Sequence, residues 1–345
     1  MNSNYDFQRF CKERNLKEST VKGYESALKK YALFHDKSFD FLMDEAINDE
    51  KSKIPLKDRK IKKRLLDYRS YLFESGMSSN SIKTYFSKVK TFYKHLEIEL
   101  PHIPTVKFEK KYETNYLDLP TKENIAQALD IVPIDLKAII LFMSSSGTAK
   151  AETLSLTVGD FIRATADYHD GGSIKEVLNY LINKEDVVPT FYLKRIKTNK
   201  FYYTFCSPEA TSAIVKYLNT RSNLKLGDKL FNFTSSQLLI IFQNINDKMN
   251  WGFKGKYRFF RSHTLRKFHA SNIGLNAEYI DALQGRSKNE VHETYIKTNP
   301  EKLKEVYKSA MKNVMIYETT EKIKKQEFNI KIVLKLNRKI YMCFI

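Results

Sequence analysis

Apolar residues recur at helical spacing through much of the first third of the chain. Stripes with intervals of three and four residues run over 21–34, 61–72 and 82–96, which is the spacing of one side of a helix. The first stripe consists of Val21, Tyr24, Leu28, Tyr31 and Phe34. Ser19 or Thr20 is expected to cap this first helix, because a hydroxyl accepts hydrogen bonds from N–H groups of the first turn. A helical first domain is therefore predicted.

The pattern changes in the second half of the chain. β-Branched and aromatic residues dominate 187–206, and a polar break at 197–200 interrupts them, which predicts a β-hairpin with basic residues at its turn. After Pro208 the helical pattern returns and continues to about residue 318. The predicted fold class is therefore mainly α, with one small β-hairpin or sheet.

Prolines mark the boundary between the two parts. Pro101, Pro104 and Pro120 fall in a stretch without a long periodic run, which is typical of a linker. The expected organisation is a helical N-terminal domain at 1–100, a linker at 101–120, an α+β domain at 121–318 and a basic C-terminal tail at 319–345.

The chain is strongly basic. Its 345 residues include 59 Lys and Arg against 40 Asp and Glu, a net charge of +19. A charge of this size favours a polyanionic partner, with nucleic acid first and an anionic membrane surface second. The membrane is disfavoured, because the longest purely apolar run, 138–143, is far shorter than the roughly 20 residues of a spanning helix. The polar first residues lack a signal-peptide core, and three scattered cysteines fit a reducing, intracellular compartment.

Motifs of several other protein classes are missing from the sequence. It contains no HExxH pair, no zinc-type cluster of Cys and His, and no GxxxxGK[ST] loop. A metalloprotease, a zinc finger and a P-loop NTPase therefore lack their signatures. We expect neither a metal nor a cofactor.

Basic residues gather in two places that fit DNA binding. Residues 248–277 contain no Asp or Glu and interleave cations with aromatic residues, which is suited to phosphate contact and stacking. On the helix predicted over 82–96, three lysines share a polar side. A solvated helix face and a charged loop over a core helix are the plainer interpretations. The candidate DNA-binding residues are Lys83, Lys90, Lys94, Lys200, Lys254, Lys256, Arg258, Arg261 and Lys267.

A set of spacings near the end of the chain carries a more specific signal. His263-Thr264-Leu265-Arg266 opens a predicted helix, Leu283-Gln284-Gly285-Arg286 follows, and Tyr295 lies nine residues beyond Arg286. This pattern resembles that of the tyrosine recombinase (phage integrase) family. The run from Gly147 to Glu152 resembles the turn that bears the family's first arginine, and the hairpin with Lys197 resembles its lysine-bearing hairpin.

Two positions depart from the family pattern. Strict spacing places Ala149 at the first arginine, with Lys150 one residue later, and we favour Lys150 as the functional cation. Lysine is a point charge that cannot make the planar two-pronged phosphate contact of arginine, so reduced activity is one expectation. Arg286 stands where the family has histidine or tryptophan, and its N–H groups still suit a phosphate oxygen.

The resemblance implies a covalent reaction on double-stranded DNA, independent of metal and ATP. It implies that Tyr295 attacks the scissile phosphate while Arg266, Arg286 and Lys150 stabilise the charge on its oxygens. Lys197 is the expected general acid, with Lys200 as runner-up. His263 would assist the tyrosine or bind the phosphate, and Glu152 would orient a cation.

The implied protein is an integrase of a virus or mobile element. It would bind attachment sites as a homotetramer in the host cytoplasm, at the nucleoid, and residues 1–100 would form a DNA-clamping domain. Two alternatives stay open: a type IB topoisomerase, which relaxes one duplex, and a DNA-binding protein that kept the fold without the catalysis. Ala149 and Lys150 favour the second alternative, whereas His263, Arg266 and Tyr295 count against it.

Overall fold

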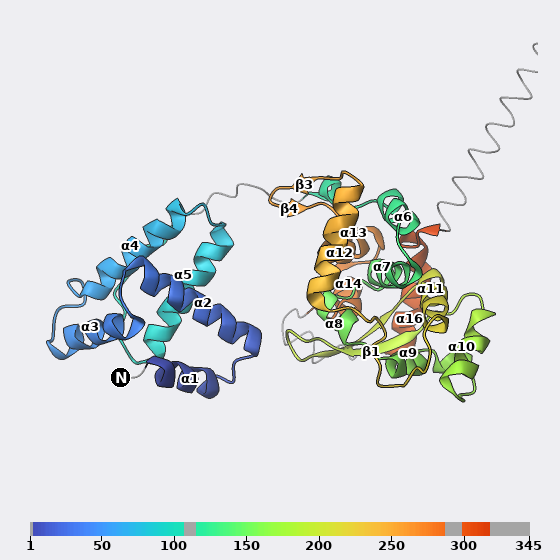
Figure 1. Ribbon diagram of the computed structural model, residues 1–345, viewed down its shortest axis with the longest axis horizontal. Coiled ribbons are helices and arrows are strands. Elements are labelled where there is room, and N and C mark those ends of the chain that lie inside the picture. Colours follow the sequence, from blue (N-terminus) through green and yellow to red (C-terminus); the bar gives the residue numbers. More distant parts are fainter. Residues whose placement is uncertain (1–2, 107–114, 287–298, 318–345) are drawn as a thin grey trace, which may run out of the picture. The chain divides into compact units, whose positions relative to one another are not determined.

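A computed structural model of the chain describes residues 3–106, 115–286 and 299–317. It divides into two compact units, Met1–Glu113 and Thr114–Ile345 (Figure 1). No helix within the described ranges is long and apolar enough to cross a membrane.

The first unit is a bundle of helices around an aromatic core. Within it, α2 packs against α3, α4 and α5, and α4 also contacts α3 and α5. The three predicted stripes are confirmed as the buried faces of α2, α4 and α5. Tyr31, Tyr68, Tyr93 and Phe92 are almost completely buried at the centre. The helices are α1 (Ser3–Glu13), α2 (Glu18–Phe34), α3 (Phe39–Lys51), α4 (Lys60–Glu74) and α5 (Ser79–His95).

The predicted cap of α2 is wrong. The helix begins at Glu18, so Ser19 and Thr20 lie inside its first turn, and Lys17 is the N-cap without a side-chain hydrogen bond. The acidic Glu18 in the first turn instead suits the positive end of the helix dipole. Serine does cap α5, where the Ser78 hydroxyl accepts from the N–H of Ser81.

The second unit is built around a nearly completely buried helix, α7 (Ile134–Ser146). Most of its residues are apolar and are buried by the neighbouring helices. α11 and α13 pack along α7, and α6 and α8 contact it (Figure 1). The other helices are α6 (Lys122–Asp130), α8 (Lys150–Ser155), α9 (Val158–Ala164), α10 (Ile174–Ile182), α11 (Pro208–Asn219), α12 (Ser235–Lys248), α13 (Ser262–Asn272), α14 (Ala277–Leu283) and α16 (Pro300–Ala310). Short 3-10 turns are η1 (Tyr116–Asp118), η2 (Ala166–Tyr168) and η3 (Met311–Asn313).

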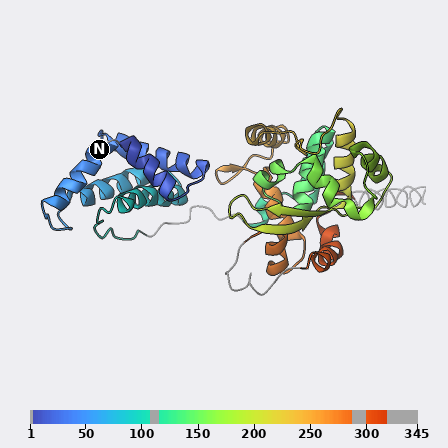
Figure 2. The same cartoon turned by 90° about the horizontal axis from the view of Figure 1, so that it is seen from below.

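The predicted hairpin is present as β1 (Thr190–Lys194) and β2 (Phe201–Phe205). The strands are antiparallel, with Thr190 opposite Phe205 and Lys194 opposite Phe201. Figure 2 shows the hairpin from a second direction. At the turn, the N–H of Arg195 donates to the Lys200 carbonyl at 2.6 Å, and the N–H of Asn199 donates to the Arg195 carbonyl at 2.7 Å. The backbone at Arg195 is therefore fixed from both sides.

The chain after Pro208 is less regular than its helical pattern predicts. A second antiparallel hairpin, β3 (Phe253–Lys254) and β4 (Tyr257–Arg258), interrupts the helices. The side chain of Asn246 fixes it, because Oδ1 accepts from the N–H of Phe260 and Nδ2 donates to the Gly252 carbonyl. Two residues per strand are too few for periodicity to reveal.

Candidate active site

Arg266 lies at the centre of a buried polar cluster in the second unit. It comes from α13, which begins at Ser262, and only 5% of its surface is exposed. Its guanidinium donates from Nη1 to the Gly147 carbonyl at 2.7 Å and from Nη2 to the Gln284 carbonyl at 2.8 Å. Two chain reversals, after α7 and after α14, thus hold the arginine in one orientation.

Gly147 is the residue that permits this approach. It ends α7 with φ of +65°, in the left-handed region that favours glycine. A Cβ atom there would lie 2.6 Å from both Nε2 of Gln284 and Nδ1 of His269. The closeness of these side chains therefore depends on the missing Cβ.

Gln284 connects the parts of the cluster. Its side-chain Nε2 donates to the Arg266 carbonyl at 3.1 Å and lies 3.0 Å from Nδ1 of His269. The next residue, Gly285, has φ of +59°, and a Cβ atom on it would lie 2.5 Å from the ring of Tyr202. The motif Leu283-Gln284-Gly285 thus closes the chain tightly around Arg266.

A second arginine reaches the same carbonyl from the hairpin. Nη1 of Arg195 donates to the Gln284 carbonyl at 3.0 Å. Arg195 and Arg266 therefore have guanidinium nitrogens within about 3 Å of one oxygen atom. Arg286 is also near, because its charge lowers the pKa of Arg266, and its Nη1 lies 3.7 Å from Oδ1 of Asp281.

Glu152 is the buried carboxylate of the cluster. It is 3% exposed, and its Oε1 accepts from the N–H of Ile196 at 3.2 Å, which ties α8 to the hairpin turn. Within the described ranges, its Oε2 has no hydrogen-bond partner, and the same holds for the hydroxyl of Tyr202 and Oε1 of Gln284. Buried polar atoms without partners are costly, and their gathering here marks a place organised for something other than stability.

The electrostatics of the cluster are those of an anion site. Burial, and then the charges of Arg195 and Arg286, lower the pKa of Arg266 to about 10. Burial and Arg266 likewise lower the pKa of His269 to about 3, so its ring is neutral at pH 7. Each shift means that the site resists further positive charge, which a bound anion would relieve.

His263 lies on the same helix as Arg266, one turn earlier. Its pKa is lowered because the surrounding protein partly desolvates the ring and because Arg261, Lys267, Arg266 and Arg286 oppose a further positive charge. The lowered pKa favours the neutral imidazole, which keeps one ring nitrogen as a hydrogen-bond acceptor.

The other predicted catalytic residues are less closely joined to the cluster. Nζ of Lys150 donates to the Ser235 carbonyl at 3.2 Å, at the start of α12. No interaction connects Lys150 with Arg266 or Arg286 among the contacts of the described residues. Lys197 lies exposed on the hairpin turn, two residues after Arg195. Tyr295 lies outside the described residues.

The candidate DNA-binding residues of the second unit fall into two groups. Several are engaged by neighbours: both Nε and Nη2 of Arg258 donate to Asp247, at 2.8 and 2.9 Å, and Nζ of Lys254 lies 3.9 Å from Oδ1 of Asp118. The guanidinium of Arg261 lies 4.4 Å from the ring centre of Tyr257. Lys256 is exposed, and Lys200 and Lys267 are half-buried.

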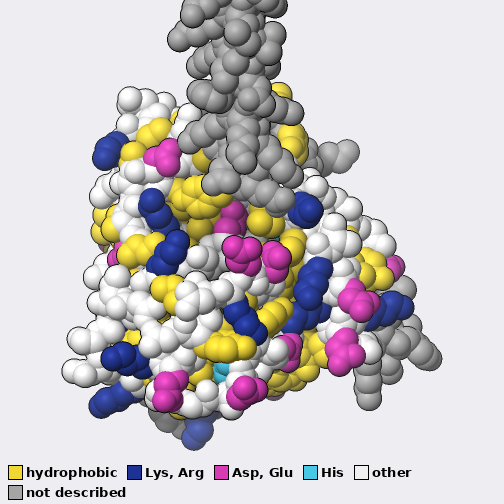
Figure 3. All heavy atoms as spheres, turned by 90° about the vertical axis from the view of Figure 1, so that its right-hand side faces the viewer, with side chains coloured by type: hydrophobic (Ala, Val, Ile, Leu, Met, Phe, Trp, Pro, Cys, Tyr) yellow, Lys and Arg dark blue, Asp and Glu magenta, His cyan; other side chains and the backbone are white. Residues whose placement is uncertain are grey.

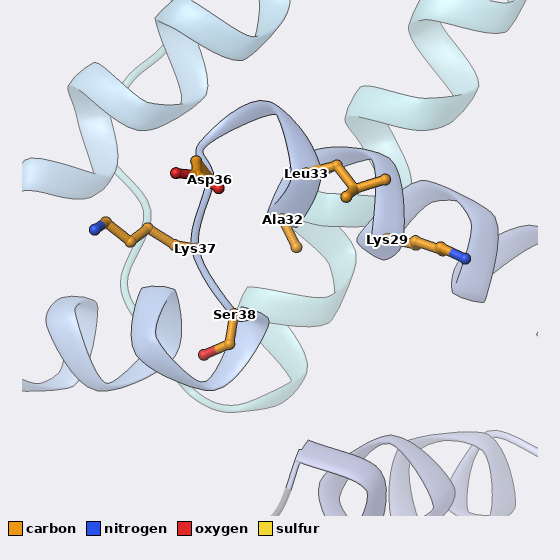
Figure 4. A pocket seen from close by; sticks show the side chains of 6 residues that line it. All are labelled: Lys29, Ala32, Leu33, Asp36, Lys37 and Ser38. Atoms are coloured by element: carbon orange, nitrogen blue, oxygen red, sulfur yellow. The ribbon is translucent and has the colours of Figure 1, made fainter.

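In the first unit, Lys83 and Lys94 are exposed on α5, and Nζ of Lys90 lies 5.4 Å from the ring centre of Phe86. A shallow hollow also lies where α2 ends and α3 begins (Figure 4). Its lining combines an exposed leucine with basic and polar side chains and offers no group of convergent catalytic residues. The lining residues are Lys29, Ala32, Leu33, Asp36, Lys37 and Ser38.

One face of the molecule carries charges of both signs. Figure 3 shows one face on which basic and acidic side chains are interspersed. Among the described residues, no group of three or more His, Cys, Asp and Glu side chains is placed to hold a metal ion.

Arg195, Gln284, His269 and Tyr202 are the residues of the cluster that the sequence interpretation missed as site residues. A signal existed for Arg195. The pattern that the chain resembles has an arginine where Ala149 stands, and Arg195 lies in the hairpin that was expected at the site. Gln284 lies inside the motif itself but carries no charge that would single it out.

Comparison with solved structures identifies the fold. A lambda integrase dimer bound to a core site is similar over 85% of this chain and 93% of that one, with 14% identity and a TM-score of 0.51. A Tn1549 transposon integrase in complex with transposon right-end DNA matches over 85% and 94%, with 14% identity and a TM-score of 0.52. The XerH site-specific recombinase bound to its difH substrate matches over 87% and 82%, with 14% identity and a TM-score of 0.50. No family model and no curated protein matches the chain.

Proposed function

We propose that this chain, which has the fold of the site-specific recombinases and integrases, is itself a tyrosine recombinase that cleaves and rejoins double-stranded DNA. The observation that carries the proposal is the setting of Arg266, which is buried, held by the carbonyls of Gly147 and Gln284, and adjacent to Arg286 and His263. Arg266, Arg286 and His263 all belong to the motif that resembles the family, and their proximity supports the proposal. The DNA-bound neighbours support DNA as the substrate.

The proposed reaction is a transesterification. The hydroxyl of Tyr295 attacks the scissile phosphorus, the bond from phosphorus to its oxygen forms, and the bond to the deoxyribose 5′-oxygen breaks. The tyrosine proton passes to a base, for which neutral His263 is suited, and the 5′-oxygen takes a proton from Lys197, with Lys200 as the alternative. The 5′-hydroxyl of a partner strand then reverses the step. The energy of the phosphodiester is retained throughout.

The fixed cations act on the charge of the two non-bridging oxygens. Arg266 and Arg286 donate to these oxygens as negative charge builds in the transition state. Lys150 would take part only if its amine left the Ser235 carbonyl. Glu152 orients the site through the hairpin, because it binds the N–H of Ile196.

The biological setting follows from the same proposal. We infer that the enzyme integrates or excises the genome of a virus or mobile element, acting as a homotetramer on attachment sites at the host nucleoid. The integrase neighbours support this role, and one of them is a tetramer on a Holliday junction. The first unit, with its lysines on α5, is the proposed clamp on the DNA.

The test is covalent trapping. Purified full-length protein is incubated with a library of nicked duplexes whose core sequences are randomised, and DNA that stays attached after denaturation is recovered and sequenced. We expect the wild type to form an adduct with a core site that can be recovered and sequenced. Tyr295→Phe is expected to form no adduct with the same site. An adduct that survives in Tyr295→Phe would contradict the assigned nucleophile.

The setting of Lys150 keeps one competing function open. Its amine contacts a backbone carbonyl, which favours a DNA-binding protein with impaired catalysis. Absence of any adduct, together with intact duplex binding, would support that alternative. Ala149→Arg and Lys150→Arg are then tested, because an adduct restored by either shows an active site that lacks one cation.

Relaxation of one supercoiled plasmid without exchange between two duplexes would indicate a topoisomerase.

A further inference from the structure

Arg195 supplies the feature that the sequence lacks at the turn after α7. In the pattern that this chain resembles, an arginine stands where strict spacing places Ala149, and the adjacent Lys150 contacts Ser235 instead of the arginine cluster. Arg195 reaches the cluster from the β1–β2 hairpin, which is a different element from the turn after α7. Nη1 of Arg195 donates to the carbonyl oxygen of Gln284, and Nη2 of Arg266 donates to the same oxygen.

We propose that Arg195 is a catalytic residue that binds the scissile phosphate in place of the arginine missing at Ala149. The inference rests on the proposed recombinase function and deepens it. Arg195 forms no covalent bond and transfers no proton in the reaction. It donates N–H groups to a non-bridging oxygen as charge builds there.

The donors needed for this role are available. A guanidinium has five N–H groups. Within the described part of the chain, Arg195 uses one of them, toward the Gln284 carbonyl, and Arg266 uses two. The N–H groups of Arg195 and Arg266 that are not used in these bonds belong to guanidinium groups that both contact the Gln284 carbonyl oxygen. Two guanidinium groups so placed can each contact one oxygen of a tetrahedral anion.

Charge balance points in the same direction. Arg195 and Arg286 both lie close enough to Arg266 for their charges to disfavour its protonated form. The buried carboxylate of Glu152 offsets one of these charges, and Asp281 lies beside Arg286. A phosphodiester brings a single negative charge, which would complete the balance.

The position of Arg195 is rigid enough for catalysis. Its N–H and carbonyl are both bound within the turn, and the N–H of the next residue, Ile196, donates to buried Glu152. A side chain on such a backbone loses little freedom when it binds the phosphate. Lys194, the preceding residue, faces elsewhere and lies 5.5 Å from the ring centre of Phe201.

The test compares variants on two forms of one substrate. The duplex recovered by covalent trapping is prepared with either the normal phosphodiester or a neutral methylphosphonate at the scissile position. Arg195→Ala is expected to slow adduct formation about 10²–10³-fold on the phosphodiester, the usual cost of losing one such donor. On the methylphosphonate, where one charged oxygen is absent, its rate should approach that of the wild type. A merely structural role would reduce both rates equally.

Two further variants make the comparison interpretable. Arg195→Gln removes the charge but retains an N–H donor for the Gln284 carbonyl, so it tests the charge even if Arg195→Ala folds poorly. We expect it to slow adduct formation on the phosphodiester as Arg195→Ala does. Arg221→Ala is the matched control, because Arg221 also donates to backbone carbonyls, those of Lys229 and Leu230, and we expect wild-type rates on both substrates. Folding is followed by the emission of Trp251, the only tryptophan, which lies in the same unit.

The outcomes separate the two proposals. Wild-type adduct that is lost in Tyr295→Phe but formed at control rate by Arg195→Gln would overturn the role of Arg195 and leave the recombinase intact. Equal losses on phosphodiester and methylphosphonate would likewise overturn it, since a positioning role does not depend on oxygen charge. Failure of the wild type to form any adduct would overturn the proposed function itself.

Discussion

Replacing Gly147 by alanine tests how tightly the cluster around Arg266 is packed. The substitution adds one methyl group at a backbone φ of +65°, at a point 2.6 Å from two buried side chains, Gln284 and His269. Both side chains are fully buried, so neither moves aside freely. The expected cost has three parts, and a second glycine in the same unit separates the first from the others.

Gly252 is that control, because its φ is +66° and a Cβ atom there would meet nothing within 4 Å. Gly252→Ala therefore carries only the left-handed backbone penalty, about 1–2 kcal/mol. Gly147→Ala carries this penalty together with overpacking of about 1–3 kcal/mol. Displacing the Gln284 amide also leaves the Arg266 carbonyl without that donor, at a cost of about 1–3 kcal/mol. The excess over the control is expected to be at least about 2 kcal/mol.

The assay is urea unfolding followed by Trp251 emission. The indole packs 5.1 Å from the ring of Phe260 and 5.9 Å from that of Phe259, so its signal reports the second unit. Gly252 adjoins this probe, and the transition midpoint, rather than the amplitude, is therefore compared. Equal midpoints for Gly147→Ala and Gly252→Ala would refute the reasoning, because they would show that the cluster accepts a methyl group without cost.

Two further predictions concern stability. Since the pKa of His269 is about 3 in the folded chain against an ordinary value of 6.5, the unfolded chain takes up the proton first on acidification. The free energy of unfolding should therefore be unaffected by this group above about pH 6.5 and fall by about 1.4 kcal/mol per unit between roughly pH 6 and 4. His269→Asn should remove that part of the slope in urea titrations at several pH values, and parallel curves for both proteins would contradict this. In the first unit, the buried hydroxyl of Tyr68 has no hydrogen-bond partner among the described residues, so Tyr68→Phe should leave the unit as stable or stabilise it by up to about 1 kcal/mol. Hydrogen exchange over 60–74 checks this, with faster exchange in the variant as the contrary result.

Helices with one buried face were predictable from the sequence. The stripes at 21–34, 61–72 and 82–96 become the core faces of α2, α4 and α5, because burial of a periodic stripe is the main force that fixes such helices. The hairpin at 190–205 was predictable for a similar reason, since its β-branched and aromatic residues alternate around a polar turn. The small hairpin at 253–258 was not, because a side chain from another element, that of Asn246, fixes it.

The site was predictable only in part. The spacing of His263, Arg266 and Arg286 locates the motif, and the structure brings these three together. The contact of Arg195 with the Gln284 carbonyl joins residues 89 positions apart, and no local pattern encodes it. Lys150 illustrates the converse. Its place in the sequence favours a catalytic cation, whereas its amine contacts Ser235 on α12.

The central claim, covalent chemistry at Tyr295, is tested most directly by mapping the trapped adduct. Trypsin cleaves after Lys288 and Lys297, and the peptide between them contains Tyr295 as its single tyrosine among the 21 of the chain. After nuclease trimming, mass spectrometry should find a nucleotide phosphate on this peptide, attached to the tyrosine oxygen. A nucleotide on any other peptide, or an adduct that leaves peptide 289–297 unmodified, would contradict the account.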